Sequence, residues 1–200
     1  MKKILFAVLM AVSFVVPAFA VNDILDTTMD LDLKIGVGLG SSLEEEDSLG
    51  KVKNDVNMPF AIAADFYYYN PEFQYIALGL GVSNLFSSKI DNKDADVDTK
   101  IGFTNVYLAV KAKYDLKDYS SFVDNVYLLL NGGYGMVSMD PDDMTVDNGF
   151  YWAAGLGTEI KKNFIFEILY AVNYAKIRDG EDADLTYSKV MLNVGYKFSF

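Results

Sequence analysis

Hydrophobic and polar residues alternate with a period of two in eight separate segments of the chain. In the first segment, Leu31 and Leu33 alternate with Asp32 and Lys34. The eight segments are residues 29–40, 60–68, 75–83, 105–114, 126–136, 150–161, 164–174 and 187–200. Such alternation is typical of strands with two different faces. At about 10 to 14 residues, the segments are also longer than the strands of most soluble proteins. The pattern predicts an all-β protein of about eight antiparallel strands.

Alternation alone fits two kinds of barrel. A soluble, lipocalin-like barrel turns its apolar face inward around a ligand, whereas a membrane barrel turns it outward to lipid. The second face decides between them, because it is rich in alanine and glycine. The glycines are Gly36, Gly38, Gly79, Gly81, Gly133, Gly135, Gly155 and Gly157. Glycine weakens a strand unless space is tight, and the interior of an eight-stranded barrel is narrow. We therefore predict a membrane-spanning, antiparallel, up-and-down β-barrel.

Charged residues of both signs share the small-residue face. They are Asp32, Lys34, Asp65, Lys111, Glu159, Glu167 and Lys189. Opposite charges inside a lumen can pair, and unpaired charges there are costly. We expect these seven residues to form a lumen charge network whose role is structural, pairing and plugging. A single β-bulge would reverse the orientation of part of a strand.

The connections between the segments alternate between long and short. The long ones are expected near residues 41–57, 84–100, 138–148 and 177–186, and the short ones near 69–72, 115–124 and 161–163. Outer-membrane barrels have short periplasmic turns and long external loops. Aromatic residues near both ends of the segments predict two interfacial girdles. The periplasmic girdle is expected to include Tyr67, Tyr68, Tyr69, Phe73, Tyr114, Phe164, Phe166, Phe198 and Phe200, and the outer girdle Phe103, Tyr134, Phe150, Trp152, Tyr170 and Tyr174.

The first twenty residues have the layout of a secretory signal peptide. Lys2 and Lys3 precede an apolar run over residues 4–16, and Ala18-Phe19-Ala20 follows Pro17 as a small-x-small cleavage site. The run is shorter than the roughly 20 apolar residues of a membrane-spanning helix. We expect residues 1–20 to be a cleaved signal peptide and residues 21–200 to form one outer-membrane barrel domain.

Composition removes several classes of function. The formal net charge of −11 argues against a nucleic-acid partner, which would call for a basic patch. The chain has no cysteine and no histidine. It therefore forms no disulfide, and it lacks the commonest general base and metal ligand. We expect no cofactor and no catalytic residue.

The last segment carries a recognisable motif. It resembles the C-terminal assembly signal of bacterial outer-membrane proteins, matched by Asn193, Gly195, Phe198 and Phe200. The resemblance implies that the outer-membrane assembly machinery recognises this strand during biogenesis. The whole segment 21–200 resembles the small eight-stranded barrels of the OmpX, OmpW and OmpA-barrel type in architecture. That resemblance implies a location in the outer membrane, outer-membrane lipid as the surroundings, and a monomer.

The predicted external loops are acidic. The acidic residues are Glu44, Glu45, Glu46, Asp47, Asp91, Asp94, Asp96, Asp98, Asp140, Asp142, Asp143, Asp147, Asp179, Glu181, Asp182 and Asp184. Clustered carboxylates can bind divalent cations weakly, or an external ligand, but a solvated loop surface is the simpler interpretation. Asp94, Asp96 and Asp98 resemble the start of an EF-hand, but Thr99 and Asn105 stand where that motif needs glycine and glutamate.

Three functional hypotheses follow. The first is a structural or surface-interaction barrel with a plugged lumen. The second is a narrow, porin-like channel for small or hydrophobic solutes, for which OmpW-like proteins are the model. The third is a lipid-modifying enzyme. The barrel families that modify lipid A use a histidine, which is absent here. A Ser–Lys or Asp–Asp site stays open, although no spacing indicates one.

Overall fold

Each of the eight predicted segments lies in a β-strand of the structure. The computed structural model describes residues 28–47, 50–70, 75–91, 100–116, 118–140, 146–179 and 181–200. The strands of this part are β1 (Thr28–Asp47), β2 (Gly50–Val56), β3 (Phe60–Tyr69), β4 (Ile76–Asp91), β5 (Lys100–Asp115), β6 (Val123–Asp140), β7 (Val146–Ile160), β8 (Phe164–Asp179) and β9 (Glu181–Ser199). Among the described residues, no helix has the length and apolarity needed to cross a bilayer. The expected signal peptide, residues 1–20, lies outside the described residues.

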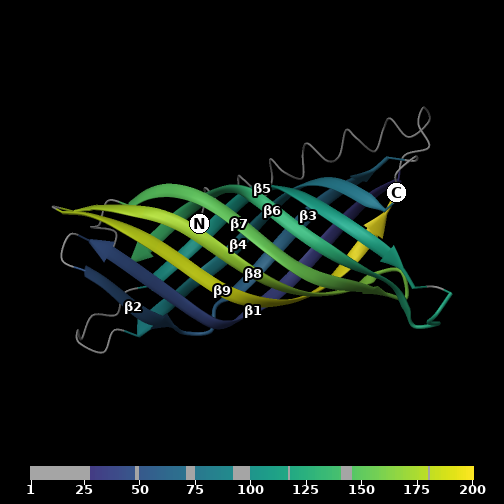
Figure 1. The fold of residues 1–200 in the computed structure, drawn as a ribbon, viewed down its shortest axis with the longest axis horizontal. Coiled ribbons are helices and arrows are strands. Elements are labelled where there is room, and N and C mark those ends of the chain that lie inside the picture. The colour runs from purple at the N-terminus through teal and green to yellow at the C-terminus, as the bar shows by residue number, and fades with distance from the viewer. Residues whose placement is uncertain are drawn as a thin grey trace.

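The strands form one antiparallel sheet that closes on itself (Figure 1). Neighbours along the chain pair with one another, and β9 pairs with β1 over a register that runs from Asp30↔Ser199 to Glu46↔Asp184. The prediction of an all-β, up-and-down barrel is confirmed. The barrel end at which Met29 and Phe200 exchange backbone hydrogen bonds is called the terminal end here, and the opposite end the far end.

The number of barrel walls is eight, because β2 and β3 together form one of them. Both pair with β1, and residues Asn57–Pro59 separate them. Proline has no N–H group for a strand ladder, which explains the interruption. The ladder continues on either side of it. Gly38 N donates to Pro59 O at 2.8 Å, and Asn57 N donates to Lys89 O at 3.0 Å.

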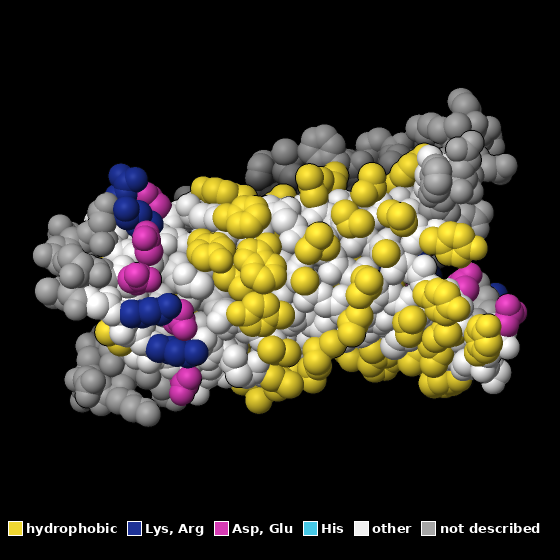
Figure 2. Space-filling model, in the orientation of Figure 1, with side chains coloured by type: hydrophobic (Ala, Val, Ile, Leu, Met, Phe, Trp, Pro, Cys, Tyr) yellow, Lys and Arg dark blue, Asp and Glu magenta, His cyan; other side chains and the backbone are white. Residues whose placement is uncertain are grey.

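Burial alternates along the walls with the predicted period. On β1, Leu33, Ile35 and Val37 are 37–52% exposed, whereas Asp32 and Lys34, which alternate with them, are buried. The same holds on the other strands, so apolar side chains cover the central part of the outer wall (Figure 2). Charged side chains lie toward the ends of that face. A barrel with an apolar outer surface and side chains filling its interior has the arrangement of a membrane barrel.

Three of the predicted girdle residues point the other way. Tyr67, Tyr69 and Phe103 are at most 4% exposed and lie inside the barrel. The prediction that they anchor the barrel at the interfaces is wrong. Each lies an even number of positions from a lumen residue on the same strand, so its side chain must also point inward. This alternation determines the orientation of the side chain, whereas its position near a strand end does not. Phe73 lies outside the described residues.

The strands also extend beyond the predicted connections at the far end. Residues 41–47 pair with β2 and with β9, so the expected long connections at 41–57 and 177–186 are mostly strand. Their acidic composition indicated loops, but opposite charges stand across neighbouring strands. Lys51 Nζ lies 2.7 Å from Glu44 Oε2, and the hydrogen bond from Lys51 lowers the pKa of Glu44. Arg178 Nε lies 2.6 Å from Asp147 Oδ2.

A β-bulge in β1 separates the membrane part of this strand from its extension. Gly40 has a φ of 61°, a left-handed conformation that favours glycine, and the register with β9 shifts between Leu39 and Ser42. Before the bulge, even-numbered residues point inward; after it, Ser41 and Leu43 do. The extension therefore points Leu43, an odd-numbered residue, into the lumen, whereas the inward residues before the bulge are even-numbered.

At the terminal end, the turn between β7 and β8 stores backbone strain that a glycine should relieve. Lys161 and Lys162 have φ values of 50° and 70°. A left-handed conformation costs a residue with a Cβ roughly 1–2 kcal/mol. We expect Lys162→Gly to raise the free energy of unfolding by about 0.5–1 kcal/mol after the entropic cost of glycine is subtracted. Urea unfolding in detergent, followed by the fluorescence of the single Trp152, would measure this. Lys162→Ala keeps the Cβ and should give no gain, so equal effects of both variants would contradict the prediction.

Candidate functional site in the barrel lumen

All seven residues predicted for the lumen charge network lie inside the barrel. Each is at most 4% exposed. They come from β1, β3, β5, β7, β8 and β9, because the side chains of alternate residues on every wall point to the common axis. The structure brings six of them into contact with an opposite charge: four belong to two clusters, and Asp32 and Lys111 form a pair between these clusters. The seventh, Lys189, lies apart.

The first cluster, called the Lys34 cluster, consists of Lys34, Asp65 and Glu167 with two tyrosines. Lys34 Nζ lies 2.5 Å from Asp65 Oδ2 and 2.9 Å from Glu167 Oε2. Tyr107 OH donates to Asp65 Oδ1 at 2.6 Å, and Tyr127 OH donates to Glu167 Oε1 at 3.0 Å. Each carboxylate thus accepts from a cation and from a phenol, which compensates for its removal from water.

The second cluster, called the Glu159 cluster, lies nearer the terminal end. Glu159 Oε1 lies 2.9 Å from Lys113 Nζ, and Glu159 Oε2 lies 2.5 Å from Lys197 Nζ and accepts from Asn125 Nδ2 at 2.8 Å. Asp30 Oδ2 stands 3.4 Å from Lys113 Nζ and 3.8 Å from Lys197 Nζ. Two lysines therefore share two carboxylates across the lumen.

Lys111 joins the two clusters. Its ammonium donates to Asp32 and lies 3.9 Å from Glu159 Oε1. It also stands 4.0 Å from the ring centroid of Tyr67 and 4.7 Å from that of Tyr127, whose hydroxyl belongs to the Lys34 cluster. Charged hydrogen bonds and cation–π contacts thus run continuously through the terminal half of the lumen.

Asp30, Lys113 and Lys197 belong to this network although the candidate set leaves them out. They have the lumen parity of their strands and are at most 12% exposed at the side chain. That parity was the signal that could have found them. Alternation places Tyr67, Tyr107 and Tyr127 on the same face. No part in the network was predicted for them, because the glycines of that face suggested a lumen of small side chains.

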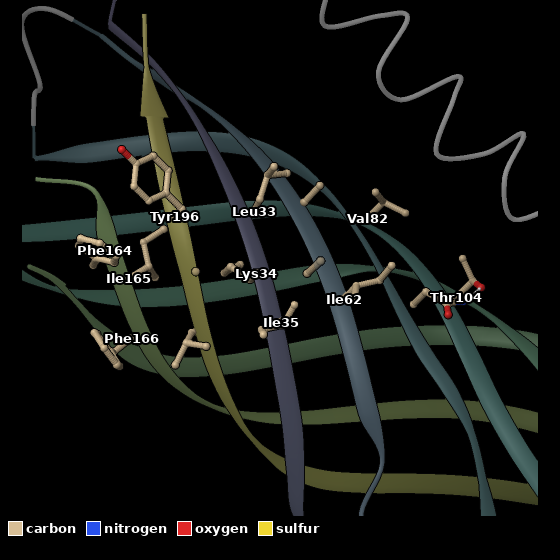
Figure 3. A pocket seen from close by; sticks show the side chains of 15 residues that line it. Leu33, Lys34, Ile35, Ile62, Val82, Thr104, Phe164, Ile165, Phe166 and Tyr196 are labelled. Atoms are coloured by element: carbon tan, nitrogen blue, oxygen red, sulfur yellow. Dashed lines mark hydrogen bonds between the residues drawn. The ribbon is translucent and has the colours of Figure 1, made fainter.

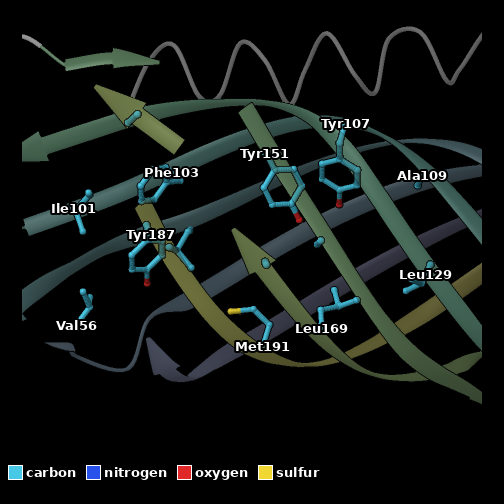
Figure 4. Close-up of a cluster of buried hydrophobic side chains, with 14 of the residues drawn as sticks. Val56, Ile101, Phe103, Tyr107, Ala109, Leu129, Tyr151, Leu169, Tyr187 and Met191 are labelled. Atoms are coloured by element: carbon cyan, nitrogen blue, oxygen red, sulfur yellow. The ribbon is translucent and has the colours of Figure 1, made fainter. Parts of the chain in front are cut away.

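An apolar layer fills the far half of the lumen. Its buried side chains include Leu43, Val56, Leu85, Ile101, Phe103, Leu185 and Tyr187, several of which Figure 4 labels. The rings of Phe103 and Tyr187 stack with centroids 5.0 Å apart. Lys189 lies beside these two rings, at 4.9 Å from the centroid of Tyr187 and 5.8 Å from that of Phe103.

The carboxylates of the lumen face lysines and do not gather into a ligand shell. The described residues contain no group of three or more Asp, Glu, His or Cys side chains arranged to hold a metal ion. Of the predicted acidic loops, residues 92–99 and 141–145 lie outside the described residues, and the side chains of Asp47, Asp91, Asp140, Asp179, Glu181 and Asp182 are not described. Glu44 and Asp147, which are described, lie on strands and pair with basic residues.

A groove of about 570 Å³ lies on the outer wall (Figure 3). Its lining is almost entirely apolar and includes the outward-pointing Leu33, Ile35, Ile62, Phe164 and Phe166. A surface of this kind suits lipid chains. Among its few polar lining residues, Lys34 pairs with Asp65 and Glu167 in the lumen, and Asn84 donates to Thr104 Oγ1 at 2.8 Å. The chemistry of the molecule is therefore concentrated in the lumen.

Three residues of the predicted assembly signal lie near the end of β9, and Phe200 directly follows this strand. Asn193 is buried and donates to Glu167 Oε2 at 3.2 Å, whereas Phe198 and Phe200 are 41% and 44% exposed on the outer wall. A Cβ at Gly195 would lie 2.6 Å from the carbonyl oxygen of Leu33 on the neighbouring strand. The glycine is thus required by close strand approach, whatever its role in biogenesis.

The family model for the outer membrane protein β-barrel domain matches residues 4–198 of the chain. The chain belongs to this family. Among solved structures, the outer-membrane protein OprG from Pseudomonas aeruginosa is similar over 86% of this chain and 95% of its own, with 10% identity and a TM-score of 0.55. Neisserial surface protein A is similar over 84% and 97%, with 13% identity and a TM-score of 0.49. No curated protein sequence matches the chain.

Membership in a family of outer-membrane barrels establishes that the walls are transmembrane strands. At 10% identity, the likeness to OprG concerns the fold alone. The particular role of this outer-membrane barrel therefore has to be argued from its lumen.

Proposed function

We propose that this outer-membrane barrel is a structural protein with a plugged, non-conducting lumen, and that its far end is a surface for interaction outside the cell. The proposal is carried by one observation: ion pairs, phenol hydrogen bonds and the cation–π contacts of Lys111 connect the Lys34 cluster to the Glu159 cluster across the lumen. No catalytic role is proposed. The terminal end, with its short turns, would face the periplasm, and residues 1–20 would be removed on export.

The energetics of the lumen favour a permanent plug over a gate. Removing one partner of a buried ion pair lowers the stability of a protein by about 3–5 kcal/mol. A path along the axis would require Lys34, Lys111, Lys113 and Lys197 to leave their carboxylates together. The apolar layer at the far half would then have to separate as well. A solute passing through the lumen would have to offset these costs with its own binding energy.

The barrel also presents a rigid far end. Strands that continue past the bulge at Gly40 carry charged side chains of both signs above the apolar wall, as Figure 2 shows at the left of that view. Cross-strand pairs such as Glu44 with Lys51 hold this extension together. The acidic connections expected beyond it are the part that a cation or an external ligand would meet first.

Single-channel recording in a planar bilayer tests the plugged lumen. We expect the purified protein, folded as judged by its heat-modifiable gel mobility, to give a quiet bilayer under conditions where a porin inserted as a control conducts. Reproducible discrete steps from the folded fraction would overturn the plug. They would support instead a narrow channel for small or hydrophobic solutes.

A further inference from the structure

Lys189 is a buried lysine that belongs to neither of the two ion-pair clusters. It is 4% exposed, and no carboxylate of the described residues lies within ion-pair distance of its ammonium. Each of the other lumen lysines, Lys34, Lys111, Lys113 and Lys197, has at least one such carboxylate. An isolated buried ammonium is costly because it has lost its water and gained no counter-charge.

A small cavity lies beside Lys189, between the Lys34 cluster and the apolar layer. Its volume is about 40 Å³. The residues of its lining that carry polar side-chain atoms are Lys34, Ser83, Asn105, Tyr107, Tyr151, Lys189 and Asn193, and no carboxylate belongs to the lining. Both charged groups that border the cavity are therefore positive.

The hydrogen-bond donors around the cavity differ in how many of their N–H groups already have an acceptor. The ammonium of Lys34 is already taken by Asp65 and Glu167. Asn105 donates to Ser83 Oγ at 3.2 Å and Asn193 donates to Glu167, but each amide carries a second N–H. Lys189 has three N–H groups, and its recorded contacts in the described part of the chain are with aromatic ring faces. The attraction of a ring face is weaker than the hydration that an ammonium loses on burial.

We propose that the cavity beside Lys189 is a binding site for one small monovalent anion of the chloride class. Lys189 Nζ supplies the charge, and the second N–H groups of Asn105 and Asn193 are the additional donors. A cavity of 40 Å³ is larger than the roughly 10–15 Å³ that one water needs. It is too small for a bulky organic anion. A single unpaired cation matches a single negative charge, which favours a halide over a phosphate or a sulfate.

The anion completes the packing of the lumen between its polar half and its apolar half. It gives Lys189 the counter-charge that the chain itself does not place there. The site does not depend on whether the barrel conducts, because it is defined by Lys189 and the cavity next to it. Its test therefore uses no conductance measurement.

Bromide in place of chloride tests the site directly. Crystals of the folded full-length protein grown in sodium bromide should show an anomalous peak in the cavity beside Lys189. The peak should be absent in Lys189→Met and present in the matched control Lys53→Met, which removes an exposed lysine. A wild-type cavity that is empty or holds water alone would overturn the proposal, as would a peak that survives in Lys189→Met.

Melting temperature supplies a second readout in solution. At equal ionic strength, replacing sodium gluconate by sodium bromide should raise the melting temperature of the wild type by roughly 2–4 °C and in a saturable manner, because an anion that binds the folded state stabilises it. Lys189→Met should show no saturable rise, and Lys53→Met should behave like the wild type. The same response in all three proteins would mean that bromide acts elsewhere, which contradicts the site.

Discussion

Replacing Lys34 with methionine should lower the free energy of unfolding by about 3–5 kcal/mol, the largest effect that we expect from a single substitution. Methionine keeps most of the aliphatic stem but removes the charge that Asp65 and Glu167 share. The side chains of both acids are fully buried, so neither carboxylate can regain water. Urea unfolding in detergent, followed by the fluorescence of Trp152, measures the loss.

Two further variants show whether the lost charge is the cause. Combining Lys34→Met with Asp65→Asn and Glu167→Gln removes the whole ion-pair set, and replacing a buried set is far cheaper than breaking it. We expect this triple variant to recover more than half of the loss. Lys53→Met is the matched control, since the Lys53 side chain is 60% exposed and its pair with Glu44 should be worth less than about 1 kcal/mol. A Lys34→Met loss as small as that of Lys53→Met would show that the Lys34 cluster does not stabilise the barrel.

The strands and their inward faces could be predicted because, in a closed barrel, every second side chain of a strand must point into the lumen. In an open, two-sided sheet, a slip of one residue is tolerated; in a closed barrel, it would place Asp32 and Lys34 in lipid. Alternation therefore identified the inward residues of six strands, and Asp65, Lys111 and Glu167 lie inside as their parity requires.

The pairing of those charges could not be predicted. Lys34 meets Glu167, which is 133 positions away, and Lys111 meets Asp32 across the lumen. Which residues lie at the same height along the barrel axis depends on how far each strand is staggered against the next. This stagger does not change the two-residue period of the sequence, so it cannot be read from that period. The same gap explains why Lys189 was grouped with the network, although the stagger places it beside Phe103 and Tyr187.

Composition misled the prediction at the far end. Residues 41–47 and 181–186 are acidic and were assigned to loops, but their inward positions carry Leu43 and Leu185. Above the membrane, a wall is apolar inside and charged outside, which is the reverse of its membrane part. The sequence pattern did not reveal this reversal on β1. The bulge at Gly40 also changes, at the same place, which of the alternating residues point inward.

Two glycines, one on the lumen face and one on the outer face of the barrel, offer a test in which the same substitution should have opposite effects on the free energy of unfolding. A Cβ at Gly81 would lie 2.2 Å from Asp65 Oδ1 and 2.2 Å from Tyr107 Cε2, two groups that bond to each other at 2.6 Å. The Tyr107 ring has little room to retreat, since the ring of Tyr151 packs against it with centroids 5.3 Å apart. We expect Gly81→Ala to lower the free energy of unfolding by about 1–3 kcal/mol, the range for overpacking.

Gly132 is the matched control, because it lies on the outer face of β6 and a Cβ there meets nothing within 4 Å. Alanine restricts the unfolded chain more than glycine does, so Gly132→Ala should raise the free energy of unfolding by roughly 0.5–1 kcal/mol. If the clash with Tyr107 is the cause at Gly81, then Tyr107→Leu should reduce the cost of Gly81→Ala, and the double variant should be more stable than the sum of the single effects. Equal losses at Gly81 and Gly132 would show instead that glycine is needed on these strands for backbone flexibility, and that the tyrosines do not set the shape of the lumen.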